Sequence, residues 1–315
     1  MSENEKSLAG IHHITAITAD AQKNIDFYSG VLGLRLVKLT VNFDDPSSYH
    51  LYYGDELGRP GTILTFFAWP GAYSGRIGPP QVSVTAFSVP TSAIDYWSKR
   101  LKEKNVELTT AADRFGERVL EFVDPDGMQL EIIGSAQPQG QPWTAGPVPA
   151  EHAIRCFHSA TISEEGYENT AKLLTEVMGF KSISNEQNRF RYRAAGDGLA
   201  STIDLICVPD ARHGSMGAGV VHHIAFRTRD DAQQIAWHKE IAHRGLNVSP
   251  VMDRTYFHSI YYREPGGVLF EIATENPGFI FDEPADRLGK KLMLPPWLEK
   301  NRAEIERAVP PVRLP

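Results

Sequence analysis

Four runs of mostly apolar residues, each with a polar residue at a comparable place, recur along the chain and predict four β-strands. They begin near residues 11, 81, 154 and 220. The polar reference positions are His13, Ser83, His158 and His223, which are separated by 70, 75 and 65 residues. Similarity at a spacing of this size is typical of a repeated structural unit. The chain is therefore expected to contain four copies of one unit.

Apolar residues at helical spacing follow each of these runs and predict an amphipathic helix. In the first copy, Ile25, Tyr28 and Leu32 would share one helix face, and Asp20 can cap the N-terminus. The other expected N-terminal residues are hydroxyl-bearing or acidic, namely Thr91 or Ser92, Glu164 or Glu165, and Asp230 or Asp231. Two or three β-rich runs come after each helix. The predicted unit is therefore β-α-β-β-β.

The order of the units suggests how the chain is divided. Residues 135–150 are rich in Pro, Gly and Gln and lie between the second and third units. We expect an N-terminal half at residues 1–145, with modules one and two, and a C-terminal half at residues 150–275, with modules three and four. The pattern ends there, and residues 276–315 form a tail with one expected helix at residues 298–308.

Units this short cannot each hold a core, so they must pair. The predicted fold class is α+β. Four βαβββ modules would form two curled mixed sheets, or half-barrels, with helices outside, and a C-terminal tail with one helix would follow.

Composition and charge narrow the choice of partners. The chain has 315 residues, of which 42% are hydrophobic and 23% are charged, and its net charge is −7. No apolar run approaches the roughly 20 residues that cross a bilayer, and the polar N-terminus is unlike a secretory signal. Two cysteines are too few for disulfide bonds to stabilise a chain of this size, so we expect a cytoplasmic protein. The acidic balance argues against nucleic acid, and nothing indicates a membrane partner.

Two adjacent histidine pairs, His12-His13 and His222-His223, are candidates for chemistry. Neighbours on a strand point to opposite faces, so one histidine of each pair should face the enclosed side. His12 and His222 share a face with mostly apolar residues and are expected to pack against helices. His13 and His223 would then face the interior, where Thr15 is a plausible polar pocket residue.

Glu271 lies in an otherwise apolar strand, where an unpaired carboxylate would cost several kcal/mol to bury. It therefore needs a cation, either a metal or an arginine such as Arg254 or Arg263. Two imidazoles and one carboxylate on strands make a set that leaves open positions on Fe(II) for a substrate and O₂. The predicted metal ligands are His13, His223 and Glu271.

The repeat also supplies a mirror-image set, His158, Ser83 and Glu131. Serine is a poor ligand for Fe(II), so this set is expected to be vestigial, with Glu131 and His158 in structural hydrogen bonds. A weak second metal there is the alternative.

The repeat and the ligand set together resemble the vicinal oxygen chelate superfamily, which includes glyoxalase I, bleomycin-binding proteins and extradiol dioxygenases. Four modules in one chain is the dioxygenase arrangement, and the resemblance covers about residues 8–275. The stretch His50-Leu51-Tyr52-Tyr53-Gly54-Asp55-Glu56-Leu57-Gly58-Arg59-Pro60-Gly61-Thr62 is similar to the same stretch in a subgroup that cleaves para-hydroquinones. The resemblance implies an Fe(II)-dependent extradiol-type dioxygenase acting on a hydroquinone or catechol with O₂.

The same resemblance implies roles for residues around the metal. Tyr261 would hydrogen-bond a substrate oxygen, although it could simply pack in the barrel wall, and Arg254 would lie in the substrate pocket. His12 and His222 would be acid–base groups, in conflict with the alternation argument, and His222 is the favoured one. Mn, Zn or Ni could occupy the same ligands. The alternatives are a metal-dependent glyoxalase-like lyase or isomerase and a non-catalytic protein that binds an aromatic toxin. A homo-oligomer is compatible with each of these three functions.

Overall fold

The computed structural model describes residues 7–109, 113–195 and 198–315, and it contains the four predicted modules. Module one consists of β1 (Ile11–Thr18), α1 (Ala21–Ile25) with a π-helical turn (Asp26–Val31), β2 (Arg35–Asn42), β3 (Asp45–Gly54) and β4 (Ile63–Ala68). Module two consists of β5 (Gln81–Pro90), a 3₁₀ turn (Thr91–Ala93), α2 (Ile94–Glu103), β6 (Leu108–Thr109), β7 (Val119–Val123) and β8 (Gln129–Ser135).

The second half of the chain repeats this order. Module three consists of β9 (Cys156–Glu164), α3 (Glu168–Lys172) with a π-helical turn (Leu173–Val177), β10 (Phe180–Glu186), β11 (Arg189–Ala194) and β12 (Thr202–Cys207). Module four consists of β13 (Val221–Thr228), α4 (Asp231–His243), β14 (Met252–Asp253), β15 (Phe257–Arg263) and β16 (Leu269–Pro277). Within the described residues, no helix is long and apolar enough to cross a membrane.

Asp20 and Asp230 cap the first and fourth helices as expected. The Asp20 side chain accepts hydrogen bonds from the backbone N–H groups of Gln22 and Lys23, and the Asp230 side chain accepts one from that of Gln233. These bonds satisfy donors that the first turn of a helix leaves without a partner.

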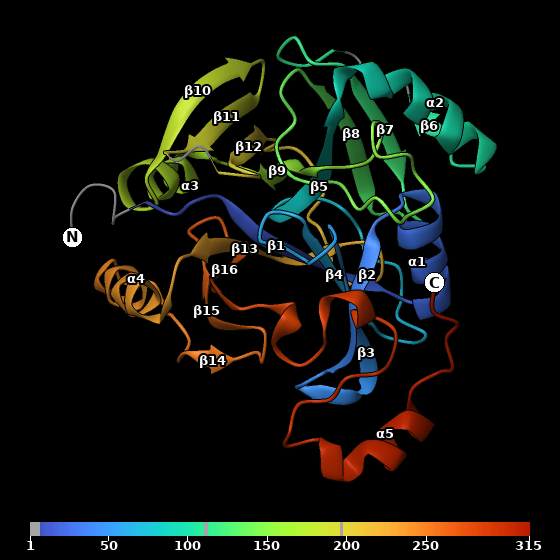
Figure 1. The fold of residues 1–315 in the computed structure, drawn as a ribbon. Coiled ribbons are helices and arrows are strands. Elements are labelled where there is room, and N and C mark those ends of the chain that lie inside the picture. The colour runs from blue at the N-terminus through green and yellow to red at the C-terminus, as the bar shows by residue number, and fades with distance from the viewer. Residues whose placement is uncertain (1–6, 110–112, 196–197) are drawn as a thin grey trace.

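Two eight-stranded mixed sheets form the body of the protein, which confirms the α+β prediction. One sheet has the order β14-β15-β16-β13-β1-β4-β3-β2, and the other has the order β10-β11-β12-β9-β5-β8-β7-β6. Figure 1 shows the two sheets one above the other, with the module helices at the periphery. Module one pairs with module four through β1 and β13, and module two pairs with module three through β5 and β9. Each sheet thus contains strands from both halves of the sequence. The division of the chain into two domains at residues 145–150 stays a prediction.

The tail confirms the expected helix and lies against module one. It contains three 3₁₀ turns (Phe279–Phe281, Ala285–Arg287 and Glu299–Asn301) followed by α5 (Arg302–Ala308). Figure 1 shows α5 on the side of β3, and Leu292 forms a parallel bridge with Leu39 of β2. The tail is therefore part of the packed structure.

A buried pair of carboxyl groups links the two sheets. Thr170 Oγ1 lies 2.8 Å from Glu164 Oε2 at the end of β9 and 2.5 Å from Glu264 Oε2 in the β15–β16 turn. Burial, together with the charge of Glu264, raises the pKa of Glu164 to about 8. The Glu164 carboxyl group therefore keeps its proton in the folded protein at neutral pH.

This carboxyl group should make stability depend on pH. Between pH 4.5 and 8 the unfolded chain releases the Glu164 proton while the folded chain keeps it, so the free energy of unfolding falls as pH rises. Glu164→Gln mimics the protonated form. It should match wild type near pH 5 and become more stable than wild type by about 1 kcal/mol per pH unit above that. Urea unfolding at pH 5, 6 and 7.5 measures the difference.

Glu176→Gln, at an exposed position in the π-helical turn that follows α3, is the matched control and should show no such trend. A constant difference between Glu164→Gln and wild type across this range would mean that the Glu164 carboxyl group is ionised in the folded protein.

Candidate metal centre

Two β-bulges bring the histidine pairs together. The pairing of β1 with β13 shifts register twice, and the extra residues at the shifts are His12 and His222. A bulge places two residues of one strand opposite one of its partner and re-aims their side chains. The prediction that His12 and His222 pack against helices is therefore wrong. His222 lines the same cavity as His223, and His12 contacts Phe257 of β15 and the carbonyl group of Thr274 of β16 rather than a helix.

His13, His223 and Glu271 converge as predicted. Glu271 Oε2 lies 3.3 Å from His13 Nε2 and 3.0 Å from His223 Nε2, and the two Nε2 atoms are 3.4 Å apart. All three side chains are buried, and their ligand atoms lie within 4.8 Å of one another. Sheet pairing explains this convergence, because His13 and Glu271 both lie opposite Ala225, on either side of β13.

The chemistry of this donor set fits a divalent metal. Ser259 Oγ donates a hydrogen bond to Glu271 Oε1, whereas Oε2 is buried with no hydrogen-bond partner among the described residues. Burial opposes ionisation of Glu271, but His13 and His223 hold its pKa well below the ordinary value. Burial lowers the pKa of His223, which favours the neutral imidazole. An ionised carboxylate and neutral imidazole nitrogen atoms are the forms that bind metals. Neither Arg254 nor Arg263 forms an ion pair with Glu271 in the described part of the chain, so the arginine alternative is wrong.

His12 fixes the tautomer of His13. His12 Nε2 lies 3.1 Å from the carbonyl oxygen of Thr274, which can only accept, so Nε2 carries the hydrogen. Burial lowers the pKa of His12 to about 3, so its Nδ1 is an acceptor. His13 Nδ1, 2.9 Å away, must then donate to it. In a neutral His13 ring the lone pair is consequently on Nε2, which faces Glu271. Hydrogen bonds of this kind orient metal-binding histidines.

The second histidine pair, His222 and His223, makes the same contact between Nδ1 atoms on the cavity side. His222 Nδ1 lies 2.8 Å from His223 Nδ1, and the His222 ring meets those of Phe67 and Trp69 edge to face. When His223 offers Nε2 to a metal, its Nδ1–H donates to His222. The hydrogen of His222 is then on Nε2, and this nitrogen can donate to a molecule in the cavity.

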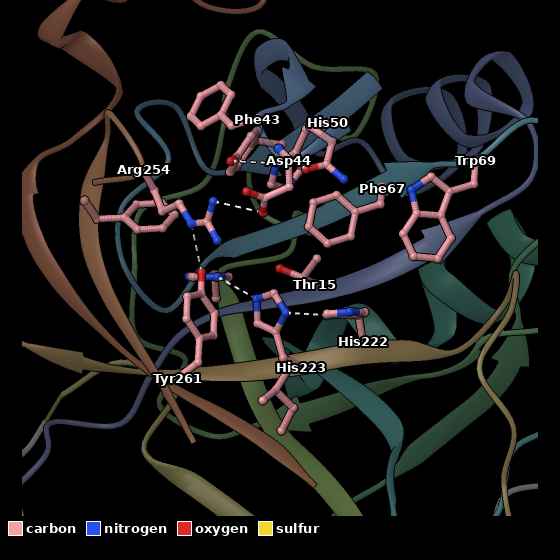
Figure 2. A pocket seen from close by; sticks show the side chains of 15 residues that line it. Thr15, Phe43, Asp44, His50, Phe67, Trp69, His222, His223, Arg254 and Tyr261 are labelled. Atoms are coloured by element: carbon pink, nitrogen blue, oxygen red, sulfur yellow. Dashed lines mark hydrogen bonds and ion pairs between the residues drawn. The ribbon is translucent and has the colours of Figure 1, made fainter. Parts of the chain in front are cut away.

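The cavity beside these ligands has a volume of about 350 Å³. Its lining residues are His13, Thr15, Asn42, Phe43, Asp44, His50, Tyr52, Phe67, Trp69, His222, His223, Arg254, Phe257, Tyr261 and Leu269. Figure 2 shows Arg254 and Tyr261 on one side and Phe67 and Trp69 on the other, with Thr15 beside His223. All of the predicted site residues except Glu271 and His12 line it, and Glu271 is fully buried in contact with His13 and His223. His12 lines a separate cavity of about 170 Å³.

Arg254 and Tyr261 form one polar wall. Arg254 Nε donates to the Tyr261 hydroxyl oxygen at 3.2 Å, and its Nη1 lies 3.1 Å from Asp44 Oδ2. Burial and the charge of Glu271 raise the pKa of Tyr261, so it is a neutral phenol. Asp44 carries no signal in the sequence, because it lies in the turn between β2 and β3, far from any repeat position. His50 belongs to the stretch that resembles the hydroquinone-cleaving subgroup, but that resemblance gives it no role.

The mirror-image site is offset by one residue from the prediction. Ala86 pairs with both Glu131 and Ser159, as Ala225 pairs with both Glu271 and His13. The structural equivalents of His13 and His223 are therefore Ser159 and Val84. The predicted equivalents, His158 and Ser83, are the bulge residues of β9 and β5 and correspond to His12 and His222. The mirror set thus has a carboxylate but neither imidazole.

An arginine neutralises the mirror carboxylate. Arg114 Nη1 lies 2.9 and 2.8 Å from the two oxygen atoms of Glu131, and His158 Nε2 lies 3.0 Å from Glu117 Oε1. The expected structural hydrogen bonds of Glu131 and His158 are confirmed. The guanidinium group supplies the positive charge that a buried carboxylate requires.

Comparison with known proteins agrees with this geometry. The profile of the Glyoxalase/Bleomycin resistance protein/Dioxygenase superfamily matches residues 10–132 and 157–272. The chain belongs to this superfamily. It is 51% identical over 306 residues to a Bacillus subtilis protein named as a ring-cleaving dioxygenase, MhqO, with 97% of each chain covered. It is 36% identical to a chlorohydroquinone/hydroquinone 1,2-dioxygenase of Sphingobium indicum, with 98% of each chain covered.

Solved structures of the superfamily share the fold. A crystal structure of a Bacillus subtilis dioxygenase matches with a TM-score of 0.95 and 50% identity, covering 98% of this chain and 99% of that one. Glyoxalase I from Zea mays matches with a TM-score of 0.63 at 14% identity over 84% of this chain and 92% of that one, which shows the fold alone. The predicted family and the predicted enzyme class, ring-cleaving dioxygenase, are confirmed by these relatives.

Proposed function

We propose that this superfamily member is an Fe(II)-dependent, extradiol-type ring-cleaving dioxygenase that acts on a hydroquinone with O₂. The observation that carries the proposal is the convergence of His13, His223 and Glu271 beside an aromatic-walled cavity. Two imidazoles and one carboxylate are the ligand set of non-haem Fe(II) oxygenases. The names of the relatives that cover nearly the whole chain support the same reaction class.

Fe(II) in this set supplies open coordination positions and the redox chemistry that joins O₂ to an electron-rich ring. The chain's own residues bind and orient the ring. Phe67 and Trp69 offer apolar surface, and a cavity of about 350 Å³ suits a single substituted ring. A para-hydroquinone can give the metal only one oxygen. Arg254 and Tyr261, which form the polar wall, are proposed to hold the other oxygen.

His222 is the proposed acid–base group, since its Nε2 is the ring nitrogen left to exchange a proton with the cavity. His12, in contrast, is proposed to orient His13, because its two nitrogen atoms are both engaged away from the cavity. Thr15 is proposed to donate a hydrogen bond to a substrate oxygen. Catechol is the less suited substrate, because its adjacent oxygen atoms would leave Arg254 without an oxygen to bind.

Oxygen uptake by anaerobically reconstituted protein tests the reaction. Fe(II)-loaded protein should consume O₂ with methylhydroquinone and produce a ring-opened acid. A glyoxalase-like lyase or isomerase would turn over its substrate without O₂, and a toxin-binding protein would bind the ring without changing it. No uptake with either methylhydroquinone or catechol, despite a full complement of Fe(II), would contradict the proposal. Mn, Zn or Ni can compete for the same ligands, so the metal content must be measured.

The cellular location and the partners of the enzyme are also part of the proposal. We place it in the cytoplasm, where Fe(II) persists and where its free cysteines, Cys156 and Cys207, stay reduced. Its partners would be the aromatic substrate and O₂. Self-association stays a prediction.

Arg254→Gln should weaken catalysis without removing the metal. The substitution deletes a charge-assisted hydrogen-bond donor on the cavity wall, which is worth about 1.5–3 kcal/mol, so kcat/KM for methylhydroquinone should fall about 10- to 100-fold. Fe(II) content should be unchanged, because Arg254 is not a ligand. Steady-state kinetics and metal analysis measure both.

Arg244→Gln is the matched control, since Arg244 is exposed at the end of α4 and pairs with Glu240 of the same helix. It should leave the kinetics unchanged. Equal kinetics for Arg254→Gln and wild type would remove Arg254 from substrate binding.

A further inference from the structure

A row of buried polar side chains crosses the sheet from the metal centre. Thr15 of β1 pairs with the ligand His223 on one side and with Thr65 of β4 on the other. Thr65 in turn pairs with Tyr52 of β3. Thr15, Thr65 and Tyr52 are each at most 2% exposed. Apolar side chains would fill these interior positions equally well, so packing alone does not account for the hydroxyl groups.

His50 joins these hydroxyl groups into one chain. Its Nδ1 lies 2.9 Å from the Tyr52 hydroxyl oxygen, and its Nε2 lies 2.8 Å from Thr65 Oγ1. Thr65 Oγ1 is 3.0 Å from Thr15 Oγ1. The connected order is therefore Tyr52, His50, Thr65, Thr15, which we call the hydroxyl chain. Of these four side chains, Thr65 is the one that does not line the cavity.

The hydrogen bonds of the chain must all run in one direction. Burial holds the pKa of His50 well below its ordinary value, so the ring is neutral and has one donor and one acceptor nitrogen. A phenol is a stronger acid than an aliphatic alcohol, so Tyr52 is the better donor to Nδ1. Nε2–H then donates to Thr65, and Thr65 donates to Thr15. The hydrogen of Thr15 remains for a molecule in the cavity.

We propose that Tyr52, His50 and Thr65 are positioning residues that hold the Thr15 hydroxyl group as a hydrogen-bond donor to an oxygen atom of a phenolic ligand beside His223. The proposal rests on the proposed function for its choice of ligand. Because each hydrogen bond polarises the next, the chain strengthens the terminal donor. It also prevents Thr15 from turning its hydrogen toward Thr65.

Thr65→Val and Thr65→Ser test the proposal. Valine keeps the shape of threonine and removes the hydroxyl group, whereas serine keeps the hydroxyl group and removes the methyl group. The first measurement is the dissociation constant of methylhydroquinone on the Fe(II)-loaded protein without O₂. Thr65→Val should weaken binding about 5- to 10-fold, as expected for a hydrogen bond worth about 1 kcal/mol, and Thr65→Ser should stay within about twofold of wild type. The Fe(II) content should be the same in all three proteins.

Thr85→Val, in the other sheet, is the matched control. Thr85 is fully buried, and its Oγ1 has no hydrogen-bond partner among the described residues, so its loss should not affect ligand binding. Tyr52→Phe provides a second variant if Thr65→Val does not fold, and it should weaken binding in the same direction. Equal binding by Thr65→Val and wild type, or equal losses in Thr65→Val and Thr65→Ser, would overturn the proposal.

The result of this binding test can be distinguished from the result of the O₂-uptake test of the proposed function. If wild type binds methylhydroquinone but consumes no O₂, weaker binding by Thr65→Val still supports the hydroxyl chain while the dioxygenase proposal fails. If wild type consumes O₂ and Thr65→Val binds as wild type does, only the hydroxyl chain fails. If wild type does not bind methylhydroquinone, both proposals are overturned.

Discussion

Glu271→Gln is expected to give a folded protein that neither retains Fe(II) nor consumes O₂. The carboxylate supplies the only negative charge among the three ligands, and its Oε2 is the atom on which both histidine Nε2 atoms converge. Changes to groups that merely support a metal ligand cost 10- to 100-fold in metal affinity, so loss of the ligand itself should cost at least about 100-fold. Metal analysis after dialysis and an oxygen electrode measure the two effects.

Folding and metal binding can be measured separately in this variant. Without metal, His13 and His223 stabilise the ionised Glu271 carboxylate and hold its pKa well below the ordinary value, and glutamine loses that interaction at nearly constant volume. Metal-free Glu271→Gln should therefore be less stable to urea than metal-free wild type, but it should still unfold in one cooperative transition. This result would separate loss of the ligand from loss of the fold.

Glu131→Gln is the control that the repeat provides. Glu131 occupies the position of Glu271 in the other sheet, but Arg114 rather than two histidines contacts it. Fe(II) content and O₂ uptake should be unchanged, although stability should fall because Arg114 loses one of its two carboxylate partners and keeps only Glu121. Full Fe(II) retention by Glu271→Gln would disprove the ligand set. Loss of part of the metal in Glu131→Gln would reveal a second site.

The sequence was sufficient to predict the modules and the three side chains that converge as candidate ligands. Strand and helix periods are local, and the repeat allowed weak signals from four copies to be combined. The ligands are recognisable because imidazole and carboxylate groups are unusual in apolar strands. The capping residues Asp20 and Asp230 were equally visible, since a cap depends on residues two or three positions away.

Register was not predictable in the same way. A β-bulge adds one residue opposite a partner strand, and a single sequence with its alternating pattern does not show where that residue is. For this reason His222 was placed on the wrong face, and the mirror set was assigned to Ser83 and His158 instead of Val84 and Ser159. Arg114, which neutralises Glu131, lies 17 residues away in the sequence and carries no local signal.

Lys38→Met is expected to lower the free energy of unfolding by about 3–5 kcal/mol, the cost of breaking a buried ion pair on one side. Lys38 of β2 is fully buried, and its Nζ lies 2.6 Å from Asp282 Oδ1 and 2.5 Å from Glu283 Oε2. It also lies over the ring of Tyr256, 4.9 Å from the centroid. Asp282 and Glu283 belong to the tail, so this lysine ties residues 276–315 to the sheet that carries the metal centre.

The cost arises because methionine leaves the buried Glu283 carboxylate without its cation. Lys38→Met with Glu283→Gln should recover part of the loss, because the double variant removes both charges. Urea unfolding of wild type, both single variants and the double variant measures this coupling. Fe(II) content at low urea should be normal in all four, since Lys38 lies outside the cavity. Additive losses in the double variant would mean that Lys38 and Glu283 stabilise the fold independently, and the tail would then be held mainly by apolar contacts such as that between Leu39 and Leu292.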